Sequence, residues 1–187
     1  MTIIKSFLIP KLLYPSSILE TPLEIVKQME KMIYTFLGKG PDKVSRVSVI
    51  NSLSDGGSNL TDLATHIKAL RLSWITRVIG EREGPWKSYL LFHLKKYGGV
   101  FLLKCNYDVN DLNLKLSGFY LEMLQWWVEF RNHFADINFS RYIMWNNKDI
   151  RIAHKPVFYN TYLGRSILSL KDLEFEKDNV HSFEFQK

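Results

Sequence analysis

One stretch of the sequence, from Thr21 to Gly38, carries the start, body and stop signals of a single α-helix. Thr21, Pro22 and Glu24 are in register for an N-cap, a first-turn proline and a capping box. At the helical period one face is apolar and comprises Ile25, Val26, Met29, Met32, Ile33, Phe36 and Leu37. The opposite face is polar and comprises Glu24, Lys27, Gln28, Glu30, Lys31 and Thr35. Gly38 follows as a stop, so the sequence predicts a helix that must bury one face in a helical core.

Apolar periodicity predicts further helices along the chain. They cover about 2–14, with a bend at Pro10, then 62–79, 85–98 and 118–134, the last with an aromatic face. Turn residues dominate 39–60, and the valines between 44 and 50 allow either a short strand or a helical turn. Residues 150–158 suggest a small hairpin. A last short helix is expected near 167–173, followed by a frayed acidic tail over 174–187.

Length, composition and charge narrow the class of protein. A chain of 187 residues with 46% hydrophobic and 24% charged residues has room for one ordinary folded domain or two small ones. Lys and Arg exceed Asp and Glu by 25 to 19. Residues 1–98 hold 14 basic and 8 acidic residues, whereas 99–187 hold 11 of each. The excess charge of the first half suits phosphates, an anionic membrane or an acidic protein. No apolar run is long enough to span a membrane.

The sequence offers no complete set of catalytic or metal-ligating residues. A single cysteine, Cys105, excludes an internal disulfide framework and a cysteine-based zinc finger, and it is expected to be a buried thiol. No two aspartates are adjacent, and no two of the five histidines are four residues apart. A nucleophile elbow and a phosphate loop are also missing from the sequence.

Several short motifs occur in an order and spacing that resemble one known family. They are Ile3-Ile4-Lys5-Ser6, Ile9-Pro10-Lys11-Leu12-Leu13-Tyr14, Phe36-Leu37-Gly38-Lys39-Gly40, Gly56-Gly57-Ser58-Asn59-Leu60-Thr61-Asp62-Leu63, Ala69-Leu70-Arg71-Leu72-Ser73-Trp74-Ile75-Thr76-Arg77, Pro85-Trp86, Cys105-Asn106, Phe119-Tyr120 with Trp127, Trp145-Asn146-Asn147, Ile150-Arg151-Ile152, Lys155-Pro156-Val157-Phe158-Tyr159 and Asp172-Leu173. The chain resembles the region that follows the palm in open reading frame 2 proteins of LINE-type non-LTR retrotransposons. That region holds the reverse-transcriptase thumb and the helical segment after it. The chain departs from the family at Gly38, Ser58 and Thr61, where the family usually has Trp, Leu and Pro.

The resemblance implies a mostly α fold. A thumb-like helical bundle is expected over residues 1–98, and a second helical segment over 99–187, with room for a small β-hairpin and the frayed tail. The family is an RNA-directed DNA polymerase, but its catalytic aspartates lie in the palm and its endonuclease lies earlier still. Its C-terminal Cys/His knuckle is also missing here. We therefore expect a fragment, or the relic of a dead element, with no catalysis by the isolated chain and with no cofactor or metal.

The resemblance also implies partners. The family's thumb packs against the template–primer duplex, so an RNA–DNA hybrid or an RNA duplex is expected, together with the missing palm and fingers, and no membrane. Lysines and arginines on helix faces would meet phosphates without reading base sequence. The candidate residues are Lys5, Lys11, Lys27, Lys31, Tyr34, Lys39, Lys43, Arg46, Lys68, Arg71 and Arg77. Of these, Tyr34 is placed to stack on a base or sugar.

Other interpretations of the same residues stay open. Each lysine can be a solvated surface charge, and Arg71 and Arg77 flank an apolar stripe where an ion pair is equally expected. The indoles of Trp74, Trp126 and Trp127 are expected in the core. A different class of function is a helical protein-interaction fragment, or a relic without a nucleic-acid role, whose first helix is apolar nearly all round. The unpaired cysteine fits the cytosol or the nucleus.

Overall fold

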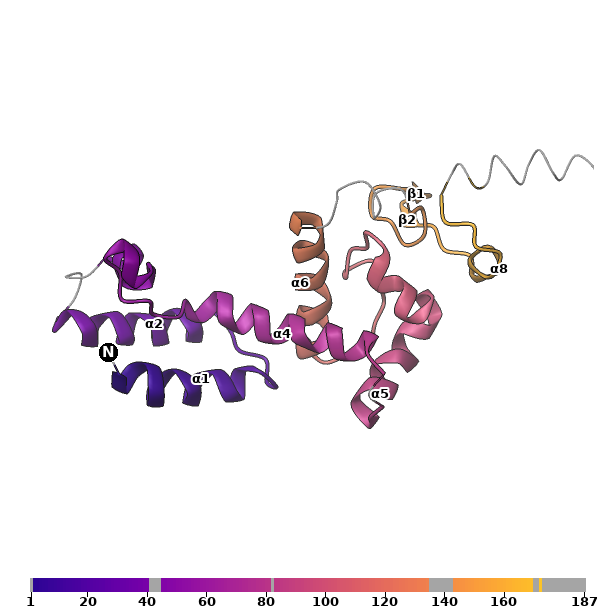
Figure 1. Ribbon diagram of the computed structural model, residues 1–187. Coiled ribbons are helices and arrows are strands. Elements are labelled where there is room, and N and C mark those ends of the chain that lie inside the picture. The colour runs from indigo at the N-terminus through magenta and orange to yellow at the C-terminus, as the bar shows by residue number, and fades with distance from the viewer. Residues whose placement is uncertain (1, 41–44, 82, 135–142, 170–171, 173–187) are drawn as a thin grey trace, which may run out of the picture. The chain divides into compact units, whose positions relative to one another are not determined.

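Helices build most of the molecule in the computed structural model, which describes residues 2–40, 45–81, 83–134, 143–169 and 172 (Figure 1). The helices are η1 (Ile4–Leu8), α1 (Ile9–Ser16), α2 (Leu23–Gly38), α3 (Arg46–Ile50), η2 (Leu53–Asp55), α4 (Leu63–Ile79), α5 (Pro85–Leu94), η3 (Lys95–Tyr97), η4 (Gly99–Lys104), α6 (Gly118–Phe134) and α8 (Asn160–Gly164). Two short strands, β1 (Arg151–Ile152) and β2 (Lys155–Pro156), complete the described part of the chain. The expectation of a mostly α fold with a small hairpin is confirmed.

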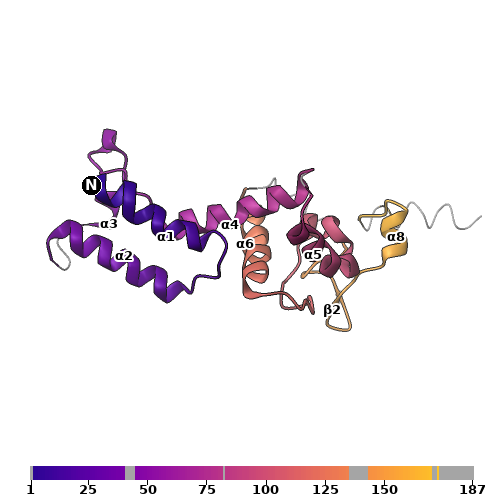
Figure 2. The ribbon, with the colours of Figure 1, turned by 90° about the horizontal axis from the view of Figure 1, so that it is seen from below.

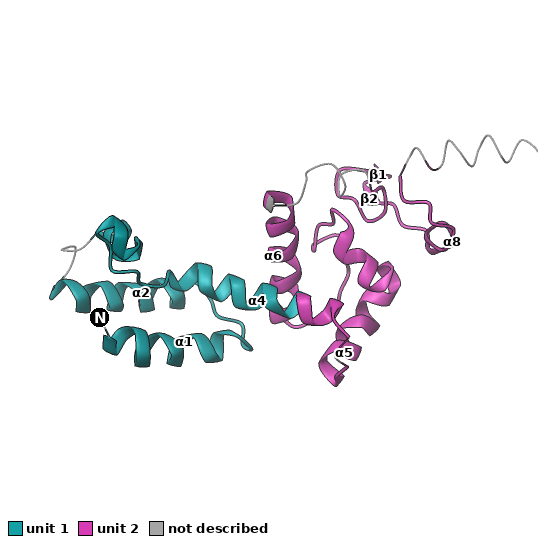
Figure 3. Ribbon diagram, in the orientation of Figure 1, with its two compact units in different colours: residues 1–75 teal, residues 76–187 magenta. Residues whose placement is uncertain are grey.

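The chain divides into two compact units, residues 1–75 and 76–187 (Figure 3). The division falls inside α4, whereas the sequence placed a boundary after residue 98. The reason is that α5 and η3 pack on η4, so that residues 85–98 belong structurally with the second half of the chain. Whether residues 1–98 correspond to one domain of a larger protein stays a prediction.

The first unit is built around α1 and α2, which lie side by side in both ribbon views (Figures 1 and 2). Its core cluster comprises Ile4, Ile9, Ile33, Val49 and Leu60, with Leu12, Leu13, Tyr34 and Leu37 packed against it. The segment around Val49, left open between strand and helix by the sequence, is the short helix α3.

The N-terminal helix begins as one π-helical segment, η1, and continues as α1. The change occurs at the proline predicted to bend this helix. Pro10 has no N–H and cannot donate to the carbonyl four residues before it, while the Ile9 N–H donates to the Ile4 carbonyl with the wider π-type spacing.

The second unit packs α5, η4 and α6 around a separate core. Leu90 and Leu94 of α5, Leu102 and Leu103 of η4, and Met123 and Leu124 of α6 are each at most 2% exposed. Met123, which lies on the aromatic face expected for α6, is therefore buried, whereas the rings of that face are only partly covered. Trp126 and Trp127 are half-buried, and Phe130 is 42% exposed.

The hairpin pairs Arg151 with Pro156 and Ile152 with Lys155 in antiparallel register. Its two turn residues, Ala153 and His154, both have positive φ, at 51° and 64°. Two consecutive left-handed residues are the conformation of a type I′ turn, whose twist matches that of the paired strands. The expected tail over 174–187 lies outside the described residues, as do 170, 171 and 173 of the helix expected near 167–173.

Candidate nucleic-acid interface

The candidate interface is the surface of the first unit on which four predicted lysines are exposed. Lys11 lies on α1, Lys27 and Lys31 lie one turn apart on α2, and Lys39 follows the end of α2. Lys27 forms an ion pair of 3.0 Å with Glu24, and both side chains are more than half exposed. A pair so exposed is weak and leaves Lys27 able to change partners.

Lys39 ends α2 in an unusual backbone conformation. Its φ is 49° and its ψ is 39°, which is left-handed, while Gly38 is still helical. The sequence predicted Gly38 as the stop, and the observed end is one residue later. The Lys39 N–H donates to the Phe36 carbonyl, and the Gly40 N–H donates to the Thr35 carbonyl at 3.1 Å. These bonds satisfy the last carbonyls of the helix and fix the lysine at its C-terminal end.

The sequence prediction assigned Glu30 to the wrong face of α2. It was placed on the polar face, but it is 6% exposed and lies on the same side as buried Val26 and Ile33. Arg46, which begins α3, forms an ion pair with the Glu30 carboxylate. A buried carboxylate requires such a partner, because desolvation of an isolated charge is costly.

Arg46 contacts both the Glu30 carboxylate and the ring of Tyr34. The Arg46 guanidinium carbon lies 5.3 Å from the centroid of the Tyr34 ring, a cation–π contact. Tyr34 is half-buried, and burial, followed by the nearby charge of Asp62, raises the pKa of its phenol. The ring is therefore covered on one side by a guanidinium and serves to hold α3 on α2. Arg46 keeps 59% of its side chain exposed and can still face a phosphate.

The removal of Glu30 from the surface has an electrostatic consequence. Between Ile25 and Gly40 the sequence has no other acid, so every charged side chain on the exposed surface of α2 after its first turn is positive. Sequence reasoning missed this feature. Glu30 lies four residues after Val26 and three before Ile33. This helical spacing could have predicted that it shares their buried face.

Lys5 and Arg71 are structural residues in the first unit. The Lys5 ammonium donates to the Ser58 carbonyl at 2.8 Å and ties η1 to the loop before α4. Arg71 is 0% exposed, and its guanidinium donates to the Leu19 carbonyl in the connection between α1 and α2. The indole N–H of Trp74 donates to the Ser17 carbonyl in the same connection at 2.9 Å. The expectation that Arg71 meets a phosphate is therefore wrong, because its guanidinium is inside the fold.

The remaining predicted residues lie in three different parts of the chain. Lys68 is exposed on the part of α4 that belongs to the first unit. Arg77 is exposed on the same helix but belongs to the second unit. Lys43 lies outside the described residues. The structure thus brings Lys11, Lys27, Lys31, Lys39 and Lys68 to the surface of one unit.

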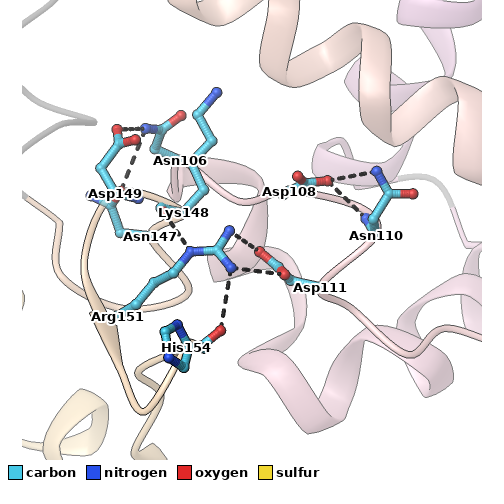
Figure 4. A network of polar contacts seen from close by, with 9 residues as sticks. All are labelled: Asn106, Asp108, Asn110, Asp111, Asn147, Lys148, Asp149, Arg151 and His154. Atoms are coloured by element: carbon cyan, nitrogen blue, oxygen red, sulfur yellow. Dashed lines mark hydrogen bonds and ion pairs between the residues drawn. The ribbon is translucent and has the colours of Figure 1, made fainter.

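A polar network in the second unit accounts for motifs that the sequence singled out without a role (Figure 4). The amide of buried Asn106 donates to the Asp149 carboxylate at 2.8 Å, and the Lys148 N–H donates to the Asn106 carbonyl at 2.8 Å. The Asn147 amide donates to the Ile143 carbonyl. Arg151 binds both oxygens of Asp111, at 2.7 and 3.2 Å. These bonds join the segment before α6 to the hairpin, so the network is structural.

The one cysteine is buried, and no metal-binding cluster is found among the described residues. Burial raises the pKa of the Cys105 thiol to about 12, with opposing contributions from Arg131 and Asn146. Such a thiol is neutral and unreactive. In the described part of the chain, no three His, Cys, Asp or Glu side chains form a group that could hold a metal ion. None of its helices has the length and apolar character needed to cross a bilayer.

No protein-family model, no curated protein and no solved structure matches this chain.

Proposed function

We propose that the first unit is a non-catalytic nucleic-acid-contacting module that grips the phosphates of an RNA–DNA hybrid or RNA duplex. The observation that carries this proposal is the exposed surface of α2 after its first turn. Lys27, Lys31 and Lys39 are exposed there, and the one acid of this stretch, Glu30, is buried and paired with Arg46. Lys11 and Lys68 add exposed charge on neighbouring helices. The motif resemblance to the thumb region of LINE-type reverse transcriptases points to the same kind of ligand.

The proposal is tested by fluorescence anisotropy of the full chain with a labelled RNA–DNA hybrid over a range of salt concentrations. Each lysine that neutralises a phosphate contributes about −0.9 to the slope of log K against log salt. A slope of about −3 or steeper is expected for the group of exposed lysines. Replacing both Lys27 and Lys31 by Glu should make the slope shallower by about 1.8 and weaken binding to hybrids of any sequence.

The matched control is Lys148→Glu with Lys155→Glu. Both residues are exposed, both belong to the second unit, and the change in net charge is the same. Equal weakening by the two double variants would mean that only the overall charge matters, and it would refute a defined site on α2. A flat salt dependence of the native chain would refute the proposal altogether.

A second candidate function, a protein-interaction module, rests on a different face of α2. Ile25, Met32 and Phe36 are 40%, 65% and 64% exposed, and half-buried Met29 completes the stripe. On the N-terminal helix Ile3, Phe7 and Tyr14 are 68%, 64% and 74% exposed. Exposed apolar faces of this size are typical of surfaces that bind protein.

The second candidate is tested by the molar mass of the full chain in light scattering over a range of concentrations. Association that is lost in Met32→Glu with Phe36→Glu, but kept in Lys27→Glu with Lys31→Glu, would favour it. A monomer at all concentrations, with no loss of hybrid binding in the apolar variants, would leave the phosphate-binding proposal as the better one.

A further inference from the structure

The segment from 84 to 107 in the second unit has a strong charge bias. It contains no Asp or Glu and has four lysines, and it forms α5, η3 and η4. Lys87 is buried, and its ammonium donates to the Gly80 carbonyl at 2.6 Å. The other three lysines, Lys95, Lys96 and Lys104, are exposed. The segment itself therefore carries four positive charges and no negative one.

Aromatic rings cover the outward face of α5. Phe92 and His93 follow Tyr89 by three and four residues and so lie on the same side of the helix as Tyr89. Leu90 and Leu94, on the other face, are buried. Phe92 is 75% exposed and Tyr89 is 46% exposed. A phenylalanine so exposed gains nothing from the core of its own unit and is free to contact a ligand.

The rings form one connected cluster. The His93 ring lies 4.8 Å from Tyr89 and 5.4 Å from Phe92, measured between centroids. The Tyr89 ring lies 5.8 Å from the ring of Tyr120 in the first turn of α6, and the Tyr120 ring lies 5.2 Å from the ring of Phe119, again between centroids. Contacts on both sides hold Tyr89 and His93 in place, so that little side-chain freedom would be lost on binding.

Cations adjoin the rings. Lys96 is one helical turn beyond Phe92, and its ammonium lies 5.4 Å from the centroid of the Tyr97 ring. Lys95 precedes it and is also exposed. Exposed rings beside cations, in a segment without acids, are the combination with which proteins bind single-stranded nucleic acid: bases stack on the rings and phosphates meet the cations. An apolar protein ligand would account for the rings but not for the lysines.

We propose that the outward face of α5 and η3, formed by Tyr89, Phe92, His93, Lys95 and Lys96, binds single-stranded nucleic acid by base stacking. This surface lies in the other unit from the lysines of α2. The inference therefore does not rest on the proposed duplex contact. It assigns a second ligand class, an unpaired strand, to a second surface.

The test uses the full chain and two labelled strands of about 12 nucleotides, within the usual range of site sizes for single-strand binding. One strand is oligothymidine, and the other is its abasic counterpart with the same phosphates. Tyr89→Ala with Phe92→Ala should weaken binding of oligothymidine at least about fivefold, the loss expected for one stacked base. Binding of the abasic strand should be unchanged. Tyr159→Ala, which removes an exposed ring of the second unit outside α5 and η3, is the control and should change neither strand.

Lys95→Glu with Lys96→Glu should weaken binding of both strands and reduce the salt dependence. Because Phe92 and both lysines are exposed, these variants are expected to keep the far-ultraviolet circular dichroism of the native chain. Native affinity for oligothymidine in the folded Tyr89 and Phe92 variant would overturn the inference, as would an equal loss for the abasic strand. Loss of single-strand binding only in the Lys27 and Lys31 variant would also overturn it, while still supporting the duplex contact on α2.

Discussion

At the scale of single residues, the Glu30–Arg46 pair gives the first unit a testable point of stability. Arg46→Ala would leave the carboxylate of Glu30 buried without its cation. Because the arginine is 59% exposed, we expect a loss of about 1–2 kcal/mol in unfolding free energy, less than for a fully buried pair. Urea denaturation measures this loss, with exposed Lys31→Ala as the control, for which a change within about 0.5 kcal/mol is expected.

A double-mutant cycle separates the pair from its surroundings. If the pair matters as described, Glu30→Leu should recover much of the stability lost in Arg46→Ala, since the double variant buries no charge. Additive losses in the double variant would show that Glu30 and Arg46 act independently.

Cys105 allows a prediction about pH. Its thiol is buried, and burial raises its pKa to about 12, against an ordinary value of about 8.5. The folded state therefore favours the protonated thiol. Its contribution to stability is complete below about pH 8.5 and is lost as the pH rises toward 12. We expect Cys105 to resist iodoacetamide at pH 8 in the native chain and to react at once in urea, as followed by mass spectrometry. Rapid labelling of the native chain at pH 8 would contradict the burial of this thiol.

At the scale of the elements, the positions of helices could be predicted from sequence much better than their buried sides. The helix predicted from the signals between Thr21 and Gly38 is α2, and the periodic run over 62–79 is α4. Periodicity is a local signal, so it is readable in one sequence. The predicted N-cap is wrong in detail: Pro22, not Thr21, precedes the first helical residue, and no described side chain caps this end of α2. The apolar stripe of α2 is wide, and only part of it is buried. The sequence of α2 could not show which part, because the residues that bury it come from the N-terminal helix and from α3, in other parts of the chain.

The candidate site shows the same limit. Lys27 and Lys31 could be predicted as exposed because they lie opposite the apolar stripe. The burial of Arg71 could not, because its acceptor is the carbonyl of Leu19, 52 residues earlier in the chain. The aromatic face of α5 was missed because α5 has no single apolar stripe. Its rings are on the surface, and Lys87 is among its buried residues.

The stability of the β1–β2 hairpin can be tested by changing its two turn residues. Ala153 and His154 both adopt a left-handed conformation that Asn and Gly adopt at lower cost. Ala153→Asn with His154→Gly should stabilise the hairpin by about 0.5–1 kcal/mol. Slower hydrogen exchange of the backbone amides of Ile152 and Lys155 would show it. Ala153→Val, which is β-branched, should accelerate exchange at the same amides, and equal rates in both variants would contradict a type I′ turn.

At the scale of the whole molecule, the two proposed binding surfaces belong to two different compact units. The lysines proposed to contact phosphates and the buried Glu30 belong to residues 1–75, and the aromatic surface of α5 belongs to residues 76–187. Each surface is supported by apolar residues of its own unit: Ile33 for α2, and Leu90 and Leu94 for α5. A change in one core should therefore alter one surface and leave the other intact.

Hydrogen exchange of the full chain tests this separation. Ile33→Ala removes buried methyl groups from the first core, and Met123→Ala removes a buried side chain from the second, each at a cost of about 2–4 kcal/mol. If the cores are energetically separate, Ile33→Ala should accelerate exchange in α1 and α2 and leave α5 and α6 unchanged, and Met123→Ala should do the reverse. Equal acceleration throughout the chain by either variant would show that the two units unfold as one cooperative block through α4, the helix in which they meet.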